Sequence, residues 1–130
     1  MESKSFLVAL TILMVLKDKV SSGEVIEVRS MQEWDRRIIR NNNGTLSVVQ
    51  FSVPWCGYCR YMKPEFVKLA ARHQDVIFLN VDADQQQNLA WRMGIRSVPT
   101  YKYFKNGRNV DSITTWRPSV INDLINRLKN

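Results

Sequence analysis

The sequence has little cysteine, a single histidine and no apolar run long enough to cross a bilayer. Its 130 residues include two cysteines, Cys56 and Cys59, and one histidine, His73. Two cysteines three positions apart cannot close a long covalent loop, which excludes a small fold held together by disulfides. A zinc site of four cysteines is excluded by count, and with one histidine available we expect no metal.

The longest apolar run, residues 6–16, follows a short polar start and is followed by charged residues 17–19. It is too short to span a bilayer, so we expect no stable membrane span. Its length is typical of a signal peptide, and residues 20–22 suit a signal peptidase. The sequence therefore predicts a signal peptide at residues 1–22 and a domain at residues 23–130, secreted or in the secretory-pathway lumen. The charged segment leaves open an uncleaved helix that tethers the domain to a membrane, or a plain extension of a cytoplasmic protein.

Positive charge exceeds negative charge, with 19 Lys and Arg against 12 Asp and Glu and a net charge of +7. Such an excess is compatible with acidic proteins, anionic membranes or nucleic acids as partners. The basic residues of the C-terminal half are interspersed with apolar positions: Arg92, Arg96, Lys102, Lys105 and Arg108. No nucleic-acid motif accompanies them, so the pattern predicts a solvated basic face and no nucleic-acid partner.

Hydrophobic periodicity switches repeatedly between the periods of strands and helices. Strands are predicted near residues 25–29, 46–51, 76–81, 101–104 and 110–113, and helices near residues 31–40, 56–73, 84–93 and 118–128. The order is therefore β-α-β-α-β-α-β-β-α, in a single α/β domain. Asp84 is expected to cap the third helix and Gly94 to end it. Asn106 and Gly107 form a strong hairpin signal, which makes the last two strands antiparallel.

Residues 55–59, Trp-Cys-Gly-Tyr-Cys, lie where a predicted central strand leads into a helix. Cys56 is therefore expected at the helix N-terminus, where unpaired N–H groups and the helix dipole favour the thiolate, the nucleophile of disulfide exchange. Cys59 follows about one turn later, close enough to attack a mixed disulfide formed at Cys56. We expect Cys56 to attack and Cys59 to resolve. Gly57 allows close approach of a partner, and Tyr58 adds a hydroxyl and an aromatic edge beside the sulfurs.

Several separate segments together resemble the thioredoxin family. They are Phe51-Ser52 before the Trp-Cys-Gly-Tyr-Cys motif, Met62-Lys63-Pro64, the strand at 76–82, the Gly-Ile-Arg-Ser-Val-Pro-Thr sequence at 94–100, and Phe104-Lys105-Asn106-Gly107. The resemblance covers most of residues 25–129. It implies a thioredoxin fold, with a central mixed sheet flanked by helices. It also implies that the protein reduces, forms or isomerises protein disulfides through a redox-active disulfide of Cys56 and Cys59, with no cofactor or metal.

The resemblance further implies how clients bind. In the family, the proline that matches Pro99 is in the cis form and faces the active disulfide, and the backbone before it pairs with the extended chain of the client. Val98 and Pro99 match these positions, and a bond before proline readily tolerates the cis form. Trp55, Gly57 and Tyr58 complete the predicted peptide groove. The implied partners are protein disulfides or dithiols, and a thioredoxin reductase or another dithiol donor.

Three positions depart from the family pattern. The family usually carries a buried aspartate at Gln50, thought to accept a proton when the second cysteine is activated, and an amide cannot titrate. Two interpretations stay open: a hydrogen-bonded core amide, or slower deprotonation of Cys59. Tyr58 replaces the usual proline and resembles some periplasmic disulfide isomerases, which leaves the redox potential unassigned. Thr115 stands where the family has glycine, so the rim of the groove is expected to differ.

Gln50 and Thr115 also motivate an alternative function, a thioredoxin-like peptide-binding module with little redox turnover. Such a module would keep its affinity for partners when both cysteines are replaced by serine, whereas an oxidoreductase would lose every outcome that depends on disulfides.

For three further side chains, the sequence predicts whether they face a partner, pack in the core or lie on the surface. Trp55, directly before Cys56, is expected to face a partner. Trp91 lies within a helical pattern and is expected to pack rather than bind. His73 is expected at a helix end on the surface, with no catalytic role.

Overall fold

The computed structural model describes residues 23–129. Its elements are, in chain order, β1 (Val25–Glu27), α2 (Met31–Trp34), the π-helical turn η1 (Asp35–Ile39), β2 (Ser47–Ser52), α3 (Gly57–Arg72), β3 (Ile77–Asp82), α4 (Gln87–Arg92), β4 (Thr100–Lys105), β5 (Arg108–Thr114) and α5 (Pro118–Leu128). The predicted order of strands and helices is confirmed, with α2 and η1 together forming the first predicted helix. The predicted signal peptide, residues 1–22, lies outside the described residues.

The five strands form one mixed sheet in the order β1-β3-β2-β4-β5. β3 runs parallel to both of its neighbours, whereas β4 is antiparallel to β2 and to β5. β2 is therefore the central strand, and its first five residues are buried because the sheet is covered on both faces. This explains why its apolar residues face both sides of the sheet, with Val48 packed on one side and Val49 and Phe51 on the other. The carboxyl end of β2 leads directly toward Cys56.

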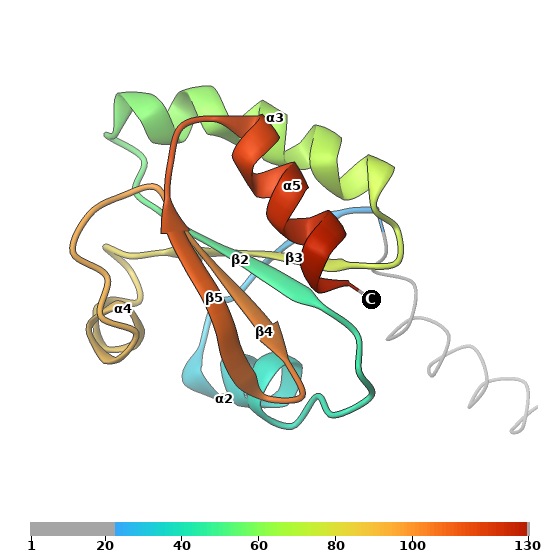
Figure 1. Ribbon diagram of the computed structural model, residues 1–130. Coiled ribbons are helices and arrows are strands. Elements are labelled where there is room, and N and C mark those ends of the chain that lie inside the picture. The colour runs from blue at the N-terminus through green and yellow to red at the C-terminus, as the bar shows by residue number, and fades with distance from the viewer. Residues whose placement is uncertain (1–22, 130) are drawn as a thin grey trace, which may run out of the picture.

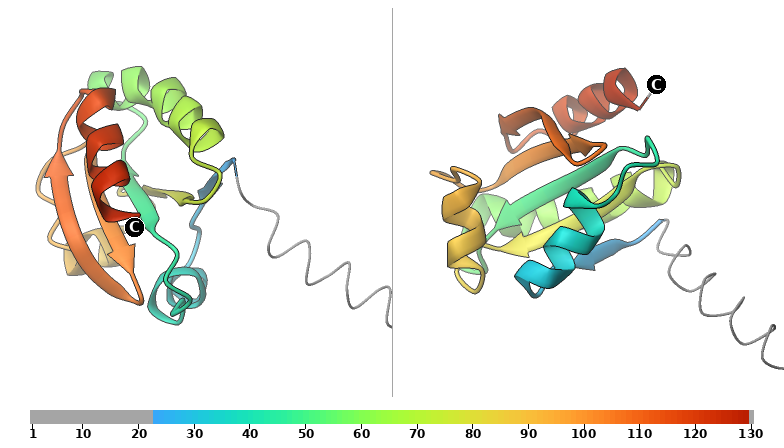
Figure 2. Two further views of the ribbon diagram at one scale, coloured as in Figure 1. Left: turned by 45° about the vertical axis from the view of Figure 1, so that its right-hand side comes forward. Right: turned by 90° about the horizontal axis from the view of Figure 1, so that it is seen from below.

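Helices cover both faces of the sheet (Figures 1 and 2). α3 and α5 pack against one face through an apolar cluster that includes Phe66 and Ile121. α2, η1 and α4 pack against the opposite face through a second cluster, to which Trp34 and Leu89 belong. Among residues 23–129, no helix has both the length and the apolar character needed to cross a membrane.

The predicted hairpin between β4 and β5 is confirmed, and its turn consists of Asn106 and Gly107. Both residues have positive φ angles, 52° and 75°, as this type of two-residue hairpin turn requires. A Cβ atom on Gly107 would lie only 2.6 Å from the carbonyl oxygen of Ile39. Glycine at this position therefore serves two purposes, since it permits the turn and lets η1 approach the hairpin closely.

Two local predictions are wrong because packing between elements overrides the local pattern. Asp84 does not cap the third helix: the N-cap position of α4 is Gln86, which makes no side-chain capping hydrogen bond. His73 does end α3, but it is buried rather than on the surface. Its Nε2 lies 2.6 Å from Oδ1 of Asn122 on α5, so the end of α3 packs against the C-terminal helix.

The prediction for Trp91 is also wrong. Its side chain is 83% exposed, the largest value among the exposed large hydrophobic side chains of residues 23–129. α4 has only six residues, and its buried side is formed by Leu89 and Ala90. On such a short helix, Trp91 is left on the solvent side.

Candidate active site

Cys56 occupies the N-cap of α3, directly after the loop that leaves the central strand. Its backbone is extended, with φ −87° and ψ 123°, and its Sγ accepts a hydrogen bond of 3.2 Å from the backbone N–H of Cys59. A backbone N–H that points at a sulfur atom at the start of a helix stabilises negative charge on that sulfur. Cys56 is also partly exposed, so a second protein can reach it.

Cys59 lies one helical turn further along α3 and is only 4% exposed. The pKa of its thiol is raised from 9.0 to about 12, mainly by burial and also by the hydrogen bond to Cys56 and the charge of Cys56, while the backbone of Val53 lowers it. Cys59 is therefore a protonated thiol at neutral pH. The two sulfurs lie close together but differ in access, since Cys56 is partly exposed and Cys59 is buried, and this suits Cys56 to attack a partner and Cys59 to react afterwards.

The structure brings Val98 and Pro99 to the first cysteine. The peptide bond between them is cis, and the Sγ of Cys56 lies 3.8 Å from the carbonyl oxygen of Val98, in position to donate a weak hydrogen bond. The hydroxyl of Thr100 donates to the carbonyl oxygen of Ser97 at 2.7 Å. This contact holds the start of β4 and the loop before it in place next to the sulfur.

Trp55 precedes Cys56 and is 71% exposed, so its indole is accessible to a partner. Its indole Nε1 donates a hydrogen bond of 2.7 Å to the carboxylate of Asp84, in the turn after β3. Asp84 therefore orients the indole, a role that its sequence position before a helical pattern did not indicate. Gly57 is exposed as well, and no atom lies within 4 Å of where its Cβ would be, which leaves room for a partner.

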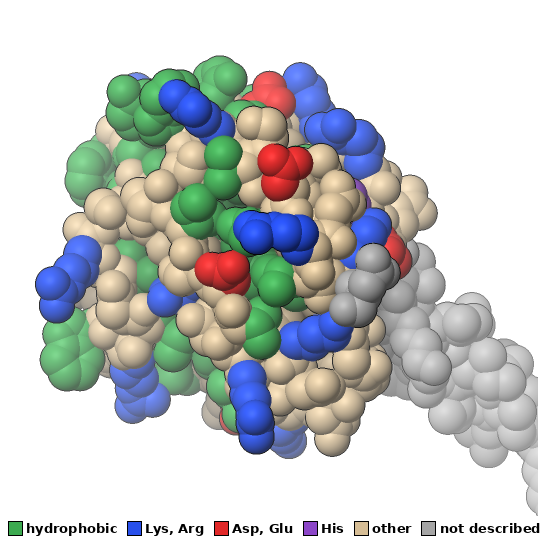
Figure 3. Space-filling view, in the orientation of Figure 1, with side chains coloured by type: hydrophobic (Ala, Val, Ile, Leu, Met, Phe, Trp, Pro, Cys, Tyr) green, Lys and Arg blue, Asp and Glu red, His purple; other side chains and the backbone are tan. Residues whose placement is uncertain are grey.

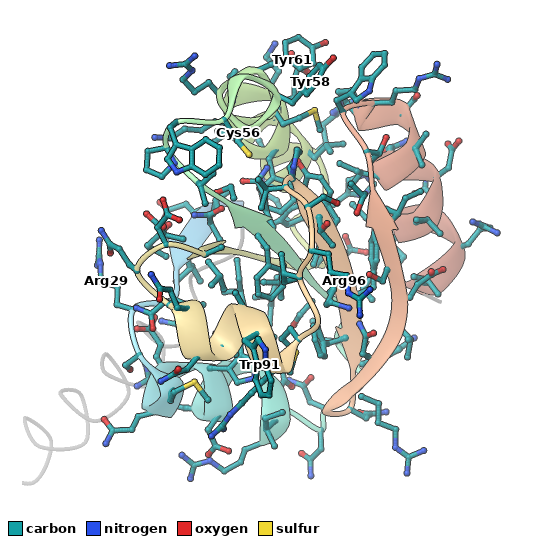
Figure 4. The ribbon with its side chains drawn as sticks, turned by 90° about the vertical axis from the view of Figure 1, so that its left-hand side faces the viewer. Arg29, Cys56, Tyr58, Tyr61, Trp91 and Arg96 are labelled. Carbon is teal, nitrogen blue, oxygen red and sulfur yellow. The ribbon has the colours of Figure 1, made fainter. Side chains whose placement is uncertain are left out.

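Tyr58 stacks on Trp116, which comes from the loop between β5 and α5. The ring centroids are 5.8 Å apart and the ring planes differ by 16°. The guanidinium carbon of Arg117 lies 5.2 Å from the centroid of Trp116, a cation–π contact. Figure 4 shows Tyr58 and Tyr61 projecting at the end of the molecule that carries Cys56, and Figure 3 shows hydrophobic side chains gathered where α3 begins. Trp116 had no predicted role, because nothing local in the sequence links it to Tyr58.

Gln50 is a buried, hydrogen-bonded amide, which is compatible with both interpretations left open for it. It is 3% exposed, and its Nε2 donates a hydrogen bond of 2.6 Å to the hydroxyl oxygen of Tyr101.

Within the described part of the chain, residues 23–129, no group of three or more His, Cys, Asp and Glu side chains is arranged to hold a metal ion.

The family model described as Thioredoxin matches residues 25–127 of this chain, which include both cysteines and the cis-proline. The chain belongs to the thioredoxin family. Thioredoxin H1 of Arabidopsis thaliana is 35% identical over 92 residues, which cover 70% of this chain and 81% of that protein. The crystal structure of thioredoxin f from spinach chloroplast, in its long form, has a TM-score of 0.80 and 30% sequence identity, and the match covers 88% of this chain and 94% of that one.

A chain in the crystal structure of the complex between ferredoxin:thioredoxin reductase and thioredoxin f2 has a TM-score of 0.77 and 27% identity, with 85% of this chain and all of that chain covered. Membership of the thioredoxin family makes this protein a thiol–disulfide oxidoreductase, and it confirms the predicted fold and class of activity.

Proposed function

We propose that Cys56 is the nucleophile and Cys59 the resolving thiol in exchange with protein disulfides. One observation carries this assignment: a partly exposed sulfur at the N-cap of α3 accepts an N–H hydrogen bond, and a buried protonated thiol lies one turn behind it. The exposed sulfur is the one that a folded client can reach, and the buried one can react only with what is already bonded to Cys56.

The proposed reduction of a client takes place in two displacements. The thiolate of Cys56 attacks one sulfur of the client disulfide, which forms a mixed disulfide and releases the other client sulfur as a thiolate. Cys59 then loses its proton and attacks Cys56, which forms the Cys56–Cys59 disulfide and releases the second client sulfur. Two electrons pass from the protein to the client, and the released client sulfurs take up protons. The reverse sequence forms a client disulfide, and the direction depends on the reduction potentials of the two couples.

The proposed client groove runs over the surface next to Cys56. Val98 and Pro99 form its floor and offer the backbone carbonyl that lies 3.8 Å from Sγ. Trp55, Gly57 and Tyr58 border it on the side of α3, and all three are exposed. The proposal also includes a thioredoxin reductase or another dithiol donor, which returns the Cys56–Cys59 disulfide to the dithiol. The structural match to the reductase complex supports this class of partner.

The Cys59→Ser variant tests the proposal most directly. It should accumulate a mixed disulfide between Cys56 and a client, visible by non-reducing electrophoresis and mass spectrometry, whereas Cys56→Ser should form none and should not reduce insulin. Full activity of Cys56→Ser would contradict the assignment of the nucleophile. A failure of Cys59→Ser to retain clients would contradict the resolving role. Unchanged partner affinity in the double serine variant, together with no turnover by the native pair, would favour the peptide-binding module instead.

The proposal extends to the compartment: we propose that residues 1–22 are removed as a signal peptide and that residues 23–130 act in the secretory pathway or outside the cell. The support is the polar start, the apolar run at 6–16 and the residues at 20–22. Mass spectrometry of the N-terminus of the protein isolated from its natural source tests this. A mature protein that begins at or near Gly23 agrees with the proposal, and one that keeps residues 1–22 contradicts it.

A further inference from the structure

A basic and aromatic surface surrounds α4, and the proposed redox reaction does not use it. We call it the α4 patch, and it consists of Arg29, Trp91, Arg92 and Arg96, all exposed. Figure 4 shows Arg29, Trp91 and Arg96 on the same face of the molecule as Cys56, and Figure 3 shows basic and hydrophobic side chains next to each other over α4. The patch thus shares a face with the reactive sulfur but lies outside the proposed groove.

Hydrogen bonds hold the three segments of the patch together. The side-chain amide of Gln86 donates to the carbonyl oxygen of Arg29 at 2.9 Å, which joins the loop after β1 to the start of α4. The N–H groups of Gly94 and Ile95 donate to the carbonyl oxygens of Trp91 and Ala90, both at 3.0 Å. The loop that carries Arg96 is therefore folded back on α4, and the patch is a defined surface rather than a set of unrelated side chains.

The positive charge of the patch is not compensated by ion pairs. None of its guanidinium groups takes part in an ion pair within residues 23–129. Carboxylates of the adjoining segments contact other groups than these guanidinium groups. Asp84 accepts a hydrogen bond from Trp55, and Asp82 accepts from the N–H groups of its own turn. Glu33 pairs with Arg37 and accepts from the backbone N–H of Arg29 at 3.4 Å, not from its guanidinium. The charge of the patch is thus available to a partner.

We propose that the α4 patch is a docking surface for an acidic protein partner, with Trp91 as its anchor. Tryptophan and arginine are among the residues that contribute most binding free energy when they become buried in a protein interface. Exposed arginines also speed association with a partner of opposite charge. The loop that carries Arg96 continues directly to Val98 and Pro99. An acidic protein whose disulfide or dithiol reacts at Cys56 can therefore contact the patch at the same time.

A protein partner suits the patch better than a nucleic acid. Proteins that bind single strands use several aromatic side chains on which successive bases stack. The α4 patch offers one indole, and the reaction on the same face acts on protein disulfides. This inference adds a second contact surface to the proposed function, and binding to the patch can be measured without any redox turnover.

The test uses the full chain in its reduced form and a synthetic peptide rich in Glu and Leu, compared with a matched peptide in which Gln replaces every Glu. Binding is measured by calorimetric titration at low and high salt for the wild type, Trp91→Ala and the double variant Arg92→Gln/Arg96→Gln. Arg127→Gln is the control, because it removes an exposed positive charge from α5, on the opposite face of the sheet. Reduction of a neutral disulfide peptide is measured in parallel to show that each variant is folded and to report on the redox reaction separately.

The acidic peptide should bind the wild type more tightly than the Gln peptide, and salt should weaken its binding. Trp91→Ala and the double arginine variant should each weaken binding roughly tenfold or more, and Arg127→Gln should not. Absent binding to the wild type, or an equal effect in the control, would overturn the inference. Binding of an oligothymidine strand is measured on the same proteins. If this strand binds the wild type more tightly than the acidic peptide does, and the same variants lose that binding, the patch is a nucleic-acid site and the inference is overturned. Failure of the wild type to reduce the neutral peptide would count against the redox proposal alone.

Discussion

The side-chain amide of Gln50 donates a hydrogen bond of 2.6 Å to the hydroxyl oxygen of Tyr101, and the two residues are register partners on β2 and β4. An amide does not titrate. Burial raises the pKa of Tyr101 above its ordinary value of 10.0, and the charges of Cys59 and Cys56 raise it further, although the bond from Gln50 lowers it. Neither group can accept the proton of Cys59 at neutral pH. That proton must pass to solvent before Cys59 attacks.

Resolution of the mixed disulfide is therefore predicted to accelerate as the pH rises from about 6 to about 9. Only the thiolate of Cys59 attacks, and below the pKa of a thiol its thiolate fraction grows about tenfold for each unit of pH. The largest cause of the raised pKa is burial, which remains when Cys56 is bonded to a client. Single-turnover kinetics with a fluorescent client disulfide would measure the step. A rate that is flat across this range would contradict the prediction.

Gln50→Glu should accelerate the same step at neutral pH, by roughly a hundredfold, because a carboxylate at this position can accept the proton of Cys59. Glutamate has nearly the same shape as glutamine, and it can accept a hydrogen bond from Tyr101. Tyr101→Phe is the matched control, since it removes the hydroxyl and adds no base, so it should keep the steep pH dependence of the wild type. Equal rates for Gln50→Glu and the wild type at neutral pH would exclude proton acceptance at this position.

The stack between Tyr58 and Trp116 is predicted to be energetically coupled. A double-mutant cycle with Tyr58→Ala and Trp116→Ala should give a coupling of about 0.5 to 1.5 kcal/mol in the free energy of unfolding, the range typical of aromatic pairs. Tyr61 is also exposed on α3 but is not stacked on Trp116. A cycle with Tyr61→Ala and Trp116→Ala should therefore give a coupling near zero. Similar couplings in the two cycles, measured by urea denaturation, would contradict a specific Tyr58–Trp116 contact.

Gly107→Ala is predicted to destabilise the protein more than Gly94→Ala. Both glycines have positive φ angles, 75° and 69°, so alanine at either position should cost about 1 kcal/mol of backbone strain. At Gly94 the added Cβ meets open space, whereas at Gly107 it would lie 2.6 Å from the backbone oxygen of Ile39. The steric conflict should add at least about 1 kcal/mol. Equal losses in the free energy of unfolding would show that the hairpin moves away from η1 without cost.

Much of the fold follows from local patterns. The central strand was recognisable because it is apolar on both faces, and the hairpin because Asn106 and Gly107 can both adopt positive φ. The place of Cys56 at the start of α3 also follows from the sequence, since the end of a strand and the start of a helical period meet at that residue. These features depend on residues that are close together along the chain.

The sequence by itself thus determined the order of the strands and helices and the position of the two cysteines at the start of a helix. Only the tertiary structure decided which side chains contact the residues around the two cysteines: Tyr101 contacts Gln50, Asp84 contacts Trp55, and Trp116 contacts Tyr58. It also left Trp91 exposed, against the prediction from its helical spacing. The physical reason is that these pairs join different elements, whose contacts depend on sheet register and packing rather than on hydrophobic period.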